Sequence, residues 1–299
     1  MMPDVVYDAI LGTGVALKQV AQSSFDPHTE TMAGRMSGSG VISDQFVTSV
    51  HPEASLTTLD LAGFMAAFGT VGTLIADGST TLIPWQKRAS GGTFSGGTSN
   101  FTVAGTASCP VLLVPESITC PRVGAPHATG KMIYLSSDGK VCPFTSAVNQ
   151  SMSSEAFNAL FGMGPVFINT VHVPRMVGYT INFGIGLSER QIYDGAVYPS
   201  DIFIETFDPT VEIQVEDFDQ FNSMFPNGVI SGFTAYMRKR ASGGTYVADA
   251  TAQHVKLSFS SGIIKPQAIS ANETKHGSGG IRIEARSLTV STASAVTSP

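Results

Sequence analysis

SDIFIETFDPTVEIQVEDFDQF, residues Ser200 to Phe221, contains the clearest strand pattern in this chain of 299 residues. From Val211 to Glu216, apolar Val and Ile alternate with Glu and Gln, which is the period of a strand buried on one face. The stretch aligns without gaps, at an offset of 157 residues, with SDQFVTSVHPEASLTTLDLAGF, residues Ser43 to Phe64. Several Ser, Asp, Phe and Pro positions are identical, and others retain apolar character. We therefore expect the same local structure twice.

A second pair of segments is nearly identical. KRASGGTF, Lys87 to Phe94, returns as KRASGGTY, Lys239 to Tyr246, at an offset of 152. Two further matches are VLLVPESI (Val111 to Ile118) with GIIKPQAI (Gly262 to Ile269) at 151, and GKMIYL (Gly130 to Leu135) with GGIRIE (Gly279 to Glu284) at 149. Small differences in loop length between two copies would produce such a drift in offset. The sequence therefore predicts a tandem duplication of one domain.

Composition and pattern favour an all-β fold. Short apolar runs alternate with Ser, Thr, 31 Gly and 16 Pro, and only 13% of the residues are charged. One short helix is expected at Leu59 to Phe68, with Thr57 and Asp60 at capping-box spacing, and a counterpart around Phe218, Phe221 and Phe225. We predict a mainly β protein made of two tandem copies of a small β-sandwich or barrel domain, each with a flanking short helix.

The expected organisation has five parts. Polar and Gly-rich segments suggest loops around residues 22–40 and 136–150, and SSEAFNALFG, Ser153 to Gly162, suggests a short linking helix. The parts are an N-terminal segment or arm (1–35), a first copy (36–150), a helical linker (151–165), a second copy (166–287) and a flexible C-terminal tail (288–299).

Charge and termini exclude several classes of function. The net charge is −6, from 17 basic and 23 acidic residues, and no basic stripe is present that would bind nucleic acid stably. The N-terminus lacks the basic residues of a signal peptide, and no apolar run reaches membrane-spanning length. We expect a soluble protein that does not bind membranes, with Cys109, Cys120 and Cys142 as mostly buried thiols.

No catalytic, cofactor or metal motif is found. Gly12 to Gly14 and Gly184 to Gly186 lack the third glycine of a dinucleotide fingerprint, and Ser37 to Gly40 lacks the strand and helix of a nucleophile elbow. The six histidines are scattered, and we interpret His127 and His276, at an offset of 149, as a shared turn residue. The acidic residues from Glu205 to Asp219 form either a solvated face or a Ca²⁺ site without EF-hand order.

The repeated KRASGGT segment has two interpretations. One is a hairpin turn in which Gly supplies positive φ and the basic residues protect a strand edge. The other is a contact that recurs in equivalent surroundings, which makes Lys87, Arg88, Lys239 and Arg240 candidates for contacts between subunits. If copy one meets copy two of the next chain as it meets its own, three chains close a ring of six similar domains.

With these blocks, the strand–helix–strand order and the Ser/Thr/Gly-rich composition, the chain resembles the tail tube proteins of long-tailed bacteriophages whose subunit carries a duplicated tube domain. The resemblance spans roughly Asp4 to Ser287. It implies trimeric, pseudo-hexameric rings stacked into a tube in the virion, assembled in the host cytoplasm, through which DNA passes without adhering. The implied protein partners are copies of itself and the tape measure, terminator and distal tail proteins.

Strand alternation makes Thr48, Ser55, Thr57, Glu205, Glu212 and Glu216 candidates for the wall of such a channel. Arg35 to Ser39 and the polar stretch before it are the candidate loop for stacking of rings. Three other functions stay open. One is a trimeric baseplate hub or distal tail protein. Another is a partner- or carbohydrate-binding β protein using Trp85 and scattered tyrosines. The third, an enzyme, has no motif in its favour.

Overall fold

The computed structural model describes residues 5–7, 9–11, 15–17, 19–35, 42–87, 100–148, 160–190, 195–216, 228–241, 244–272 and 275–297. The chain is mainly β, as predicted, with one α-helix among the described residues. The first half contains β1 (Val5–Tyr7), β2 (Ala9–Leu11), β3 (Val15–Leu17), β4 (Val20–Asp26), β5 (Thr29–Arg35), β6 (Ile42–Val50), β7 (Glu53–Thr58), α1 (Leu61–Phe68), β8 (Thr73–Ile75), β9 (Leu82–Lys87), β10 (Asn100–Gly105), β11 (Val111–Pro121), β12 (His127–Tyr134) and β13 (Phe144–Val148).

In the second half, the described residues between 160 and 297 form strands without an α-helix. These are β14 (Phe161–Ile168), β15 (Val171–His172), β16 (Met176–Asn182), β17 (Ile185–Arg190), β18 (Asp201–Phe207), β19 (Thr210–Val215), β20 (Val229–Ile230), β21 (Phe233–Lys239), β22 (His254–Phe259), β23 (Gly262–Asn272), β24 (Lys275–Ala285) and β25 (Thr289–Ser294).

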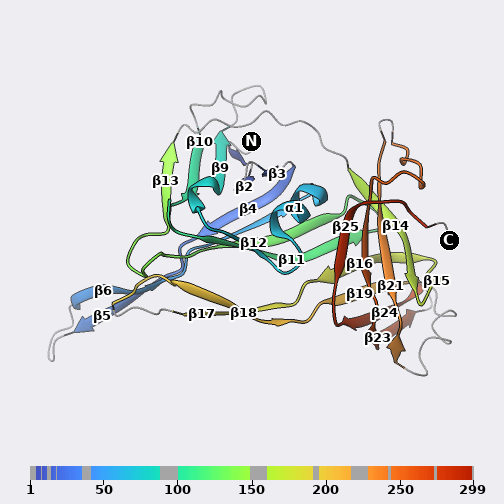
Figure 1. The fold of residues 1–299 in the computed structure, drawn as a ribbon. Helices are drawn as coiled ribbons and strands as arrows, with labels where there is room; N and C mark the ends of the chain where they lie inside the picture. The colour runs from blue at the N-terminus through green and yellow to red at the C-terminus, as the bar shows by residue number, and fades with distance from the viewer. Residues whose placement is uncertain are drawn as a thin grey trace.

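A ten-stranded antiparallel sheet runs through both halves (Figure 1). Its order is β20-β23-β24-β19-β16-β11-β12-β7-β4, with β8 beside β11, so the halves join where β11 pairs with β16. A six-stranded sheet contains β1, β2, β3, β9, β10 and β13, and a five-stranded sheet contains β14, β15, β21, β22 and β25.

Most of the buried apolar residues form one contiguous core. Leu56 and Met132 of the large sheet, Ile83 of the six-stranded sheet and Leu257 of the five-stranded sheet belong to the same cluster. Along β7 and β19 the buried positions alternate with more accessible ones, as predicted, because only one face of the large sheet packs on this core. The other face is mainly polar, except where the β17–β18 hairpin covers Leu112, Val114 and Ile133.

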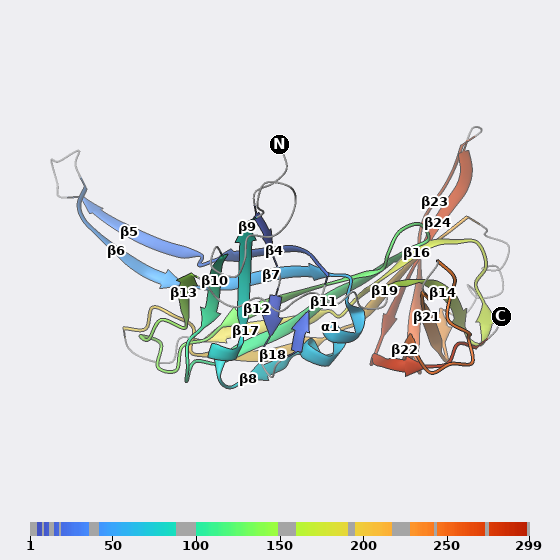
Figure 2. The same ribbon diagram turned by 90° about the horizontal axis from the view of Figure 1, so that it is seen from above.

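Two hairpins form separate two-stranded sheets, β5–β6 and β17–β18. Figure 1 shows β17 and β18 running beneath the large sheet, whereas β5 and β6 extend away from the body. From above, the β5–β6 hairpin and the β23–β24 pair project at opposite ends of an elongated molecule (Figure 2).

The strand pairings of the first half recur in the second half with the same registers. Asp44 pairs with Gly34 as Asp201 pairs with Arg190, which keeps the predicted offset of 157 along β6 and β18. Ser55 lies between Ser24 and Lys131 as Glu212 lies between Thr180 and Arg282. Five strands of the first half have a counterpart that pairs with the equivalent strand of the second half. Strands β4, β5, β7, β11 and β12 correspond to β16, β17, β19, β23 and β24, respectively.

Irregular features recur as well. The β4–β7 and β16–β19 ladders are bulged after Val20 and after Met176, and β11 and β23 are bulged after Pro115 and after Pro266. Positive φ angles at Gln19 (60°) and Arg175 (50°) precede β4 and β16. A non-glycine residue with positive φ is uncommon, so its recurrence at matching register positions is a specific similarity.

The registers correct one sequence match. Tyr134 pairs with Val111 as Ala285 pairs with Gly262, so the offset along β12 and β24 is 151 rather than 149. The two-residue error was invisible to the apolar pattern because a shift of two keeps every side chain on the same face. His127 therefore corresponds to Ser278, and its predicted equivalence with His276 is wrong.

Several segments expected to be irregular are strands. Strands β4 and β5 lie between residues 20 and 35, where a loop or arm was expected, and residues 144–148 form β13. The expected flexible tail contains β25, and after this strand Val296 is only 8% exposed. These segments lack a clear strand pattern in the sequence, and pairing with neighbouring strands stabilises them as strands. Phe161 and Gly162 begin β14, while residues 151–159 of the expected linker helix lie outside the described residues.

Helix α1 was predicted nearly correctly. Leu61, Phe64 and Phe68 are buried, but the N-cap is Asp60, whose Oδ1 accepts a hydrogen bond from Gly63 N at 3.0 Å, rather than Thr57. The rings of Phe64 and Phe68 stack over β12, where a Cβ added at Gly130 would lie 2.7 Å from Phe68 Cε1. The expected counterpart helix lies outside the described residues.

Candidate assembly interface

The junction between the halves is a main-chain ladder. β11 and β16 pair from Ser117 with Asn182 to Pro121 with Gly178. Two further hydrogen bonds extend the ladder, Phe183 N to the Glu116 carbonyl at 2.9 Å and Arg122 N to the Val177 carbonyl at 2.8 Å. A sheet edge of one half is thus completed by an edge of the other.

Side chains on both faces of this ladder match. Ile118 and Ile181 are fully buried on the core face, and the Oγ1 atoms of Thr119 and Thr180 lie 3.4 Å apart. Burial raises the pKa of Cys120 to about 12, although its hydrogen bond with Tyr179 lowers it. Arg122 Nη1 forms an ion pair with Glu216 Oε2 at 3.1 Å across the junction.

Beside the junction, burial raises the pKa of Glu116, an effect that Lys131 opposes and Glu53 strengthens. Its carbonyl accepts the hydrogen bond from Phe183 N described above.

The β17–β18 hairpin reinforces the junction from the opposite face of the sheet. Leu112, Val114, Ile133 and Leu135 of the first half are at most 6% exposed, and Ile185, Leu187 and Ile202 of the hairpin pack against them. This second apolar cluster is separate from the main core.

The segment between β17 and β18 also binds the first half through its main chain. Val50 N donates to the Val197 carbonyl and Ser136 N donates to the Pro199 carbonyl, each at 2.8 Å. The Gly139 carbonyl accepts from both Val197 N and Tyr198 N. A Cβ at Gly139 would lie 2.6 Å from Ala196 Cβ, so a glycine permits this close approach.

The large sheet ends in two edges that correspond to the two strands of the junction. β4, at one end, corresponds to β16; β23, near the other, corresponds to β11. β20 pairs with β23 only at Gly262 and Ile263, as β8 pairs with β11 only at its beginning. Among the described strands, the rest of β23 pairs only with β24, and β4 pairs only with β7.

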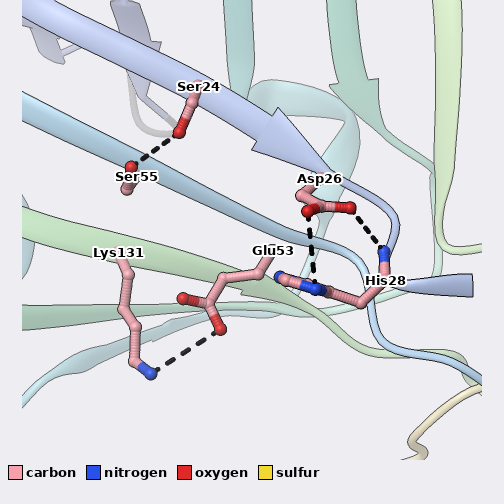
Figure 3. Close-up of polar contacts among 6 residues, drawn as sticks. All are labelled: Ser24, Asp26, His28, Glu53, Ser55 and Lys131. Atoms are coloured by element: carbon pink, nitrogen blue, oxygen red, sulfur yellow. Dashed lines mark hydrogen bonds and ion pairs between the residues drawn. The ribbon is translucent and has the colours of Figure 1, made fainter.

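The polar face of the sheet carries hydroxyl groups close to the β4 edge. Ser24 Oγ lies 2.7 Å from Ser55 Oγ, and Lys131 Nζ lies 3.6 Å from Glu53 Oε2 (Figure 3). At the edge itself, Asp26 accepts a hydrogen bond from His28 N at 2.8 Å (Figure 3).

Basic side chains at matching positions of this face are paired with acids. Arg282, the counterpart of Lys131, lies 3.8 Å from Glu212 and 4.0 Å from Glu284, and Lys265 lies 2.6 Å from Glu284. The face therefore combines Ser and Thr hydroxyls with neutralised cations.

The channel-wall candidates divide into two groups. Ser55, Thr57 and Glu212 lie on the polar face, and Glu216 follows β19 on the same side by alternation. Thr48 and Glu205 are exposed on the two hairpins instead, outside the large sheet. Sequence alternation could not separate these groups because it assigns a face within one strand and not the sheet to which the strand belongs.

The repeated basic segment lies away from the junction. Lys239 ends β21 and Arg240 forms a bridge with Tyr246, while Ala241 N donates to the Thr245 carbonyl at 2.7 Å and Gly244 has φ of 85°. These features support the hairpin-turn interpretation. The backbone of Lys87 belongs to β9, and Arg88, like the stacking-loop residues 36–39, lies outside the described residues.

Other candidate chemistry is dispersed. Tyr134, Tyr179 and Tyr236 are at most 3% exposed and cannot form the proposed ligand surface. Cys109 and Cys120 are buried and Cys142 is exposed, all as free thiols. Within the described ranges, no three His, Cys, Asp or Glu side chains gather as metal ligands, and no helix is long and apolar enough to span a membrane.

Sequence reasoning missed β4, β16 and the hairpins that follow them. Aligned by register, VAQSSFD of β4 and MVGYTIN of β16 share no identical residue. The signal that could have suggested the match is weak: apolar character is retained at Val20 and Met176, Ala21 and Val177, and Phe25 and Ile181. Comparison of the chain with protein-family models and with curated proteins found no match.

Proposed function

We propose that this chain arose by tandem duplication of one β domain and is a structural protein that assembles with copies of itself into closed rings. The recurring registers, bulges and positive φ angles support the duplication. The observation that carries the assembly is the pair of complementary edges at the ends of the ten-stranded sheet. An edge of the β11 type and an edge of the β16 type already join within the chain, and one of each remains.

Repeating the junction between two chains defines the intermolecular register. The end of β23 in one chain would pair with β4 of the next: Ala268 with Asp26, Ile269 with Phe25, Ser270 with Ser24, Ala271 with Ser23 and Asn272 with Gln22. Because the two surfaces differ, the contact is heterologous and repeats until a ring closes.

The residues at these positions suit such a pairing. Ile269 and Phe25 replace the buried pair Ile118 and Ile181, and two serines replace Thr119 and Thr180. One hydrogen bond of the junction is absent from the copy, because Pro27 stands where Phe183 donates its N–H. The other paired positions of the proposed ladder contain no proline, so their main-chain N–H groups can all donate.

The resemblance to tail tube proteins then favours three chains per ring and rings stacked into the tail tube of a virion. In that assembly the part of the polar face that the hairpins leave uncovered lines the channel. Hydroxyl groups and ion-paired cations give a wall to which DNA phosphates do not adhere, since adhesion requires unopposed Lys or Arg. The function is thus a conduit for DNA delivery, without catalysis.

A disulfide designed between Ser24→Cys and Ser270→Cys tests the register. Within one chain, seven inter-strand spacings of about 4.8 Å separate β4 from β23 along the sheet, far beyond the reach of a disulfide. In a Cys142→Ser background, we expect oxidation to link chains covalently into species of up to three chains on a non-reducing gel. Electron microscopy of the same sample should show rings or tubes.

Matched variants identify the cause of any link. Either cysteine alone should leave the chains unlinked, because a heterologous contact does not bring identical positions together. Ser24→Cys combined with Ser260→Cys, an exposed position outside the sheet, should also fail to link. Equal linking in all variants, or a monomer at every concentration, would refute the proposed assembly; a single ring that never stacks would favour a baseplate hub.

A further inference from the structure

The two hairpins occupy equivalent places in the two halves but have different surfaces. Ile185, Leu187 and Ile202 of the β17–β18 hairpin pack on the first half. By register, their counterparts in the β5–β6 hairpin are Thr29, Thr31 and Gln45. The apolar positions of the docked hairpin are therefore polar in the hairpin that extends from the molecule.

The surfaces that would receive the hairpins differ in the same way. The docked hairpin rests on Leu112, Val114, Ile133 and Leu135. The counterparts of these residues in the second half are Ile263, Lys265, Glu284 and Arg286. Ile263 is 49% exposed, whereas Leu112 is 6% exposed, so the second surface is uncovered within the chain.

All three hairpin positions and three of the four receiving positions thus change from apolar to polar, and Ile263 alone stays apolar. Had only the hairpin changed, polar groups would face an apolar surface and lose their hydrogen bonds to water without replacement. A matched change on both sides is expected if the two surfaces meet.

We propose that the β5–β6 hairpin of one chain docks on the polar face of β23 and β24 in a second copy, through a mainly polar contact at positions where the contact within the chain is apolar. This inference rests on the proposed ring, because edge pairing of β4 with β23 brings the hairpin over that face. The occupant is a second copy of this chain.

The difference has a consequence for assembly. The apolar contact within the chain forms once, on folding, and does not depend on salt. The contacting positions of the uncovered hairpin and its receiving face are polar except Ile263, so they stay hydrated on the free subunit, although Met32, Phe46 and Val47 of the hairpin are exposed apolar side chains. Lys265 and Arg282 are ion-paired with Glu284 and Glu212, so Arg286 leaves the receiving face with one basic residue in excess, a charge that favours acidic groups on the hairpin.

A charge-reversal cycle tests this contact without disturbing a core. Thr31 is exposed, so Thr31→Lys and Thr31→Glu should fold normally. We expect Thr31→Lys to raise the concentration at which half of the chains assemble at least threefold, and Thr31→Glu to leave it unchanged or lower it. In a Lys265→Glu background the effects should reverse, so that Thr31→Lys assembles at a lower concentration than Thr31→Glu. Sedimentation velocity over a concentration series measures the midpoint.

The controls are Thr145→Lys and Thr145→Glu, at an exposed position of β13 in another sheet. Their effect on the assembly midpoint should be the same with Lys265 and with Lys265→Glu. Additive effects at Thr31 and Lys265 would overturn the proposed contact. If the Ser24 and Ser270 cysteines still link chains in that case, the ring stands and only the hairpin contact fails. Absence of both linking and association would overturn both proposals.

Discussion

A single glycine determines how closely helix α1 approaches the large sheet. A Cβ at Gly130 would lie 2.7 Å from Phe68 Cε1 and 2.9 Å from Phe64 Cε2, and both rings are fully buried. Aromatic rings in a packed core cannot withdraw without moving the helix. We expect Gly130→Ala to lower the free energy of unfolding by about 1–3 kcal/mol. Chemical denaturation monitored by circular dichroism measures this change.

Gly34→Ala is the matched control. It also lies in a strand, but only Asp44 O is within 4.0 Å of an added Cβ, so stability should change by less than about 0.5 kcal/mol. Equal losses for both variants would show that the helix accommodates a methyl group at Gly130.

Substitutions at equivalent positions of the two hairpins should affect the stability of the subunit differently. Leu187 packs on a buried apolar cluster, so Leu187→Thr should destabilise the subunit by about 1–2 kcal/mol through lost apolar burial. Thr31, its counterpart, is exposed in the single chain, and Thr31→Leu should leave the unfolding free energy unchanged. Denaturation at a concentration below assembly measures both.

A loss of stability for Thr31→Leu as large as that for Leu187→Thr would contradict this difference. It would mean that the β5–β6 hairpin already packs within its own chain.

For the whole molecule, the charge pattern of the polar face predicts how it meets DNA. Lys131 is paired with Glu53, and Arg282 with Glu212 and Glu284. We expect no measurable affinity for duplex DNA at moderate salt. The double variant Glu53→Gln and Glu212→Gln should bind DNA in a salt-dependent manner, because it leaves cations without their full complement of acids. Fluorescence anisotropy of a labelled duplex measures this binding.

The control is Glu205→Gln, which also removes a carboxylate but lies on the β17–β18 hairpin, outside the large sheet. This variant should not bind duplex DNA. Binding by the unmodified protein as strong as by the double variant would exclude the polar face as a non-adhesive channel wall.

Local sequence patterns predicted the mainly β class, the alternation of β7 and β19 and most of helix α1, and they revealed the matches between the halves in KRASGGT and the segments around it. These features are local: a strand with one buried face needs alternation, and a short helix needs a cap and an apolar stripe. The channel-wall candidates Ser55, Thr57 and Glu212 followed from the same rule.

The tertiary structure alone determined which edges meet. β4 and β16 share no identical residue at aligned positions, because a strand in a ladder is held by main-chain groups that every residue but proline provides. Parts of the loops expected at residues 22–40 and 136–150 are strands for the same reason. The difference between the hairpins depends on contacts between residues about 70 positions apart, such as Leu112 and Leu187, and no local pattern encodes such a contact.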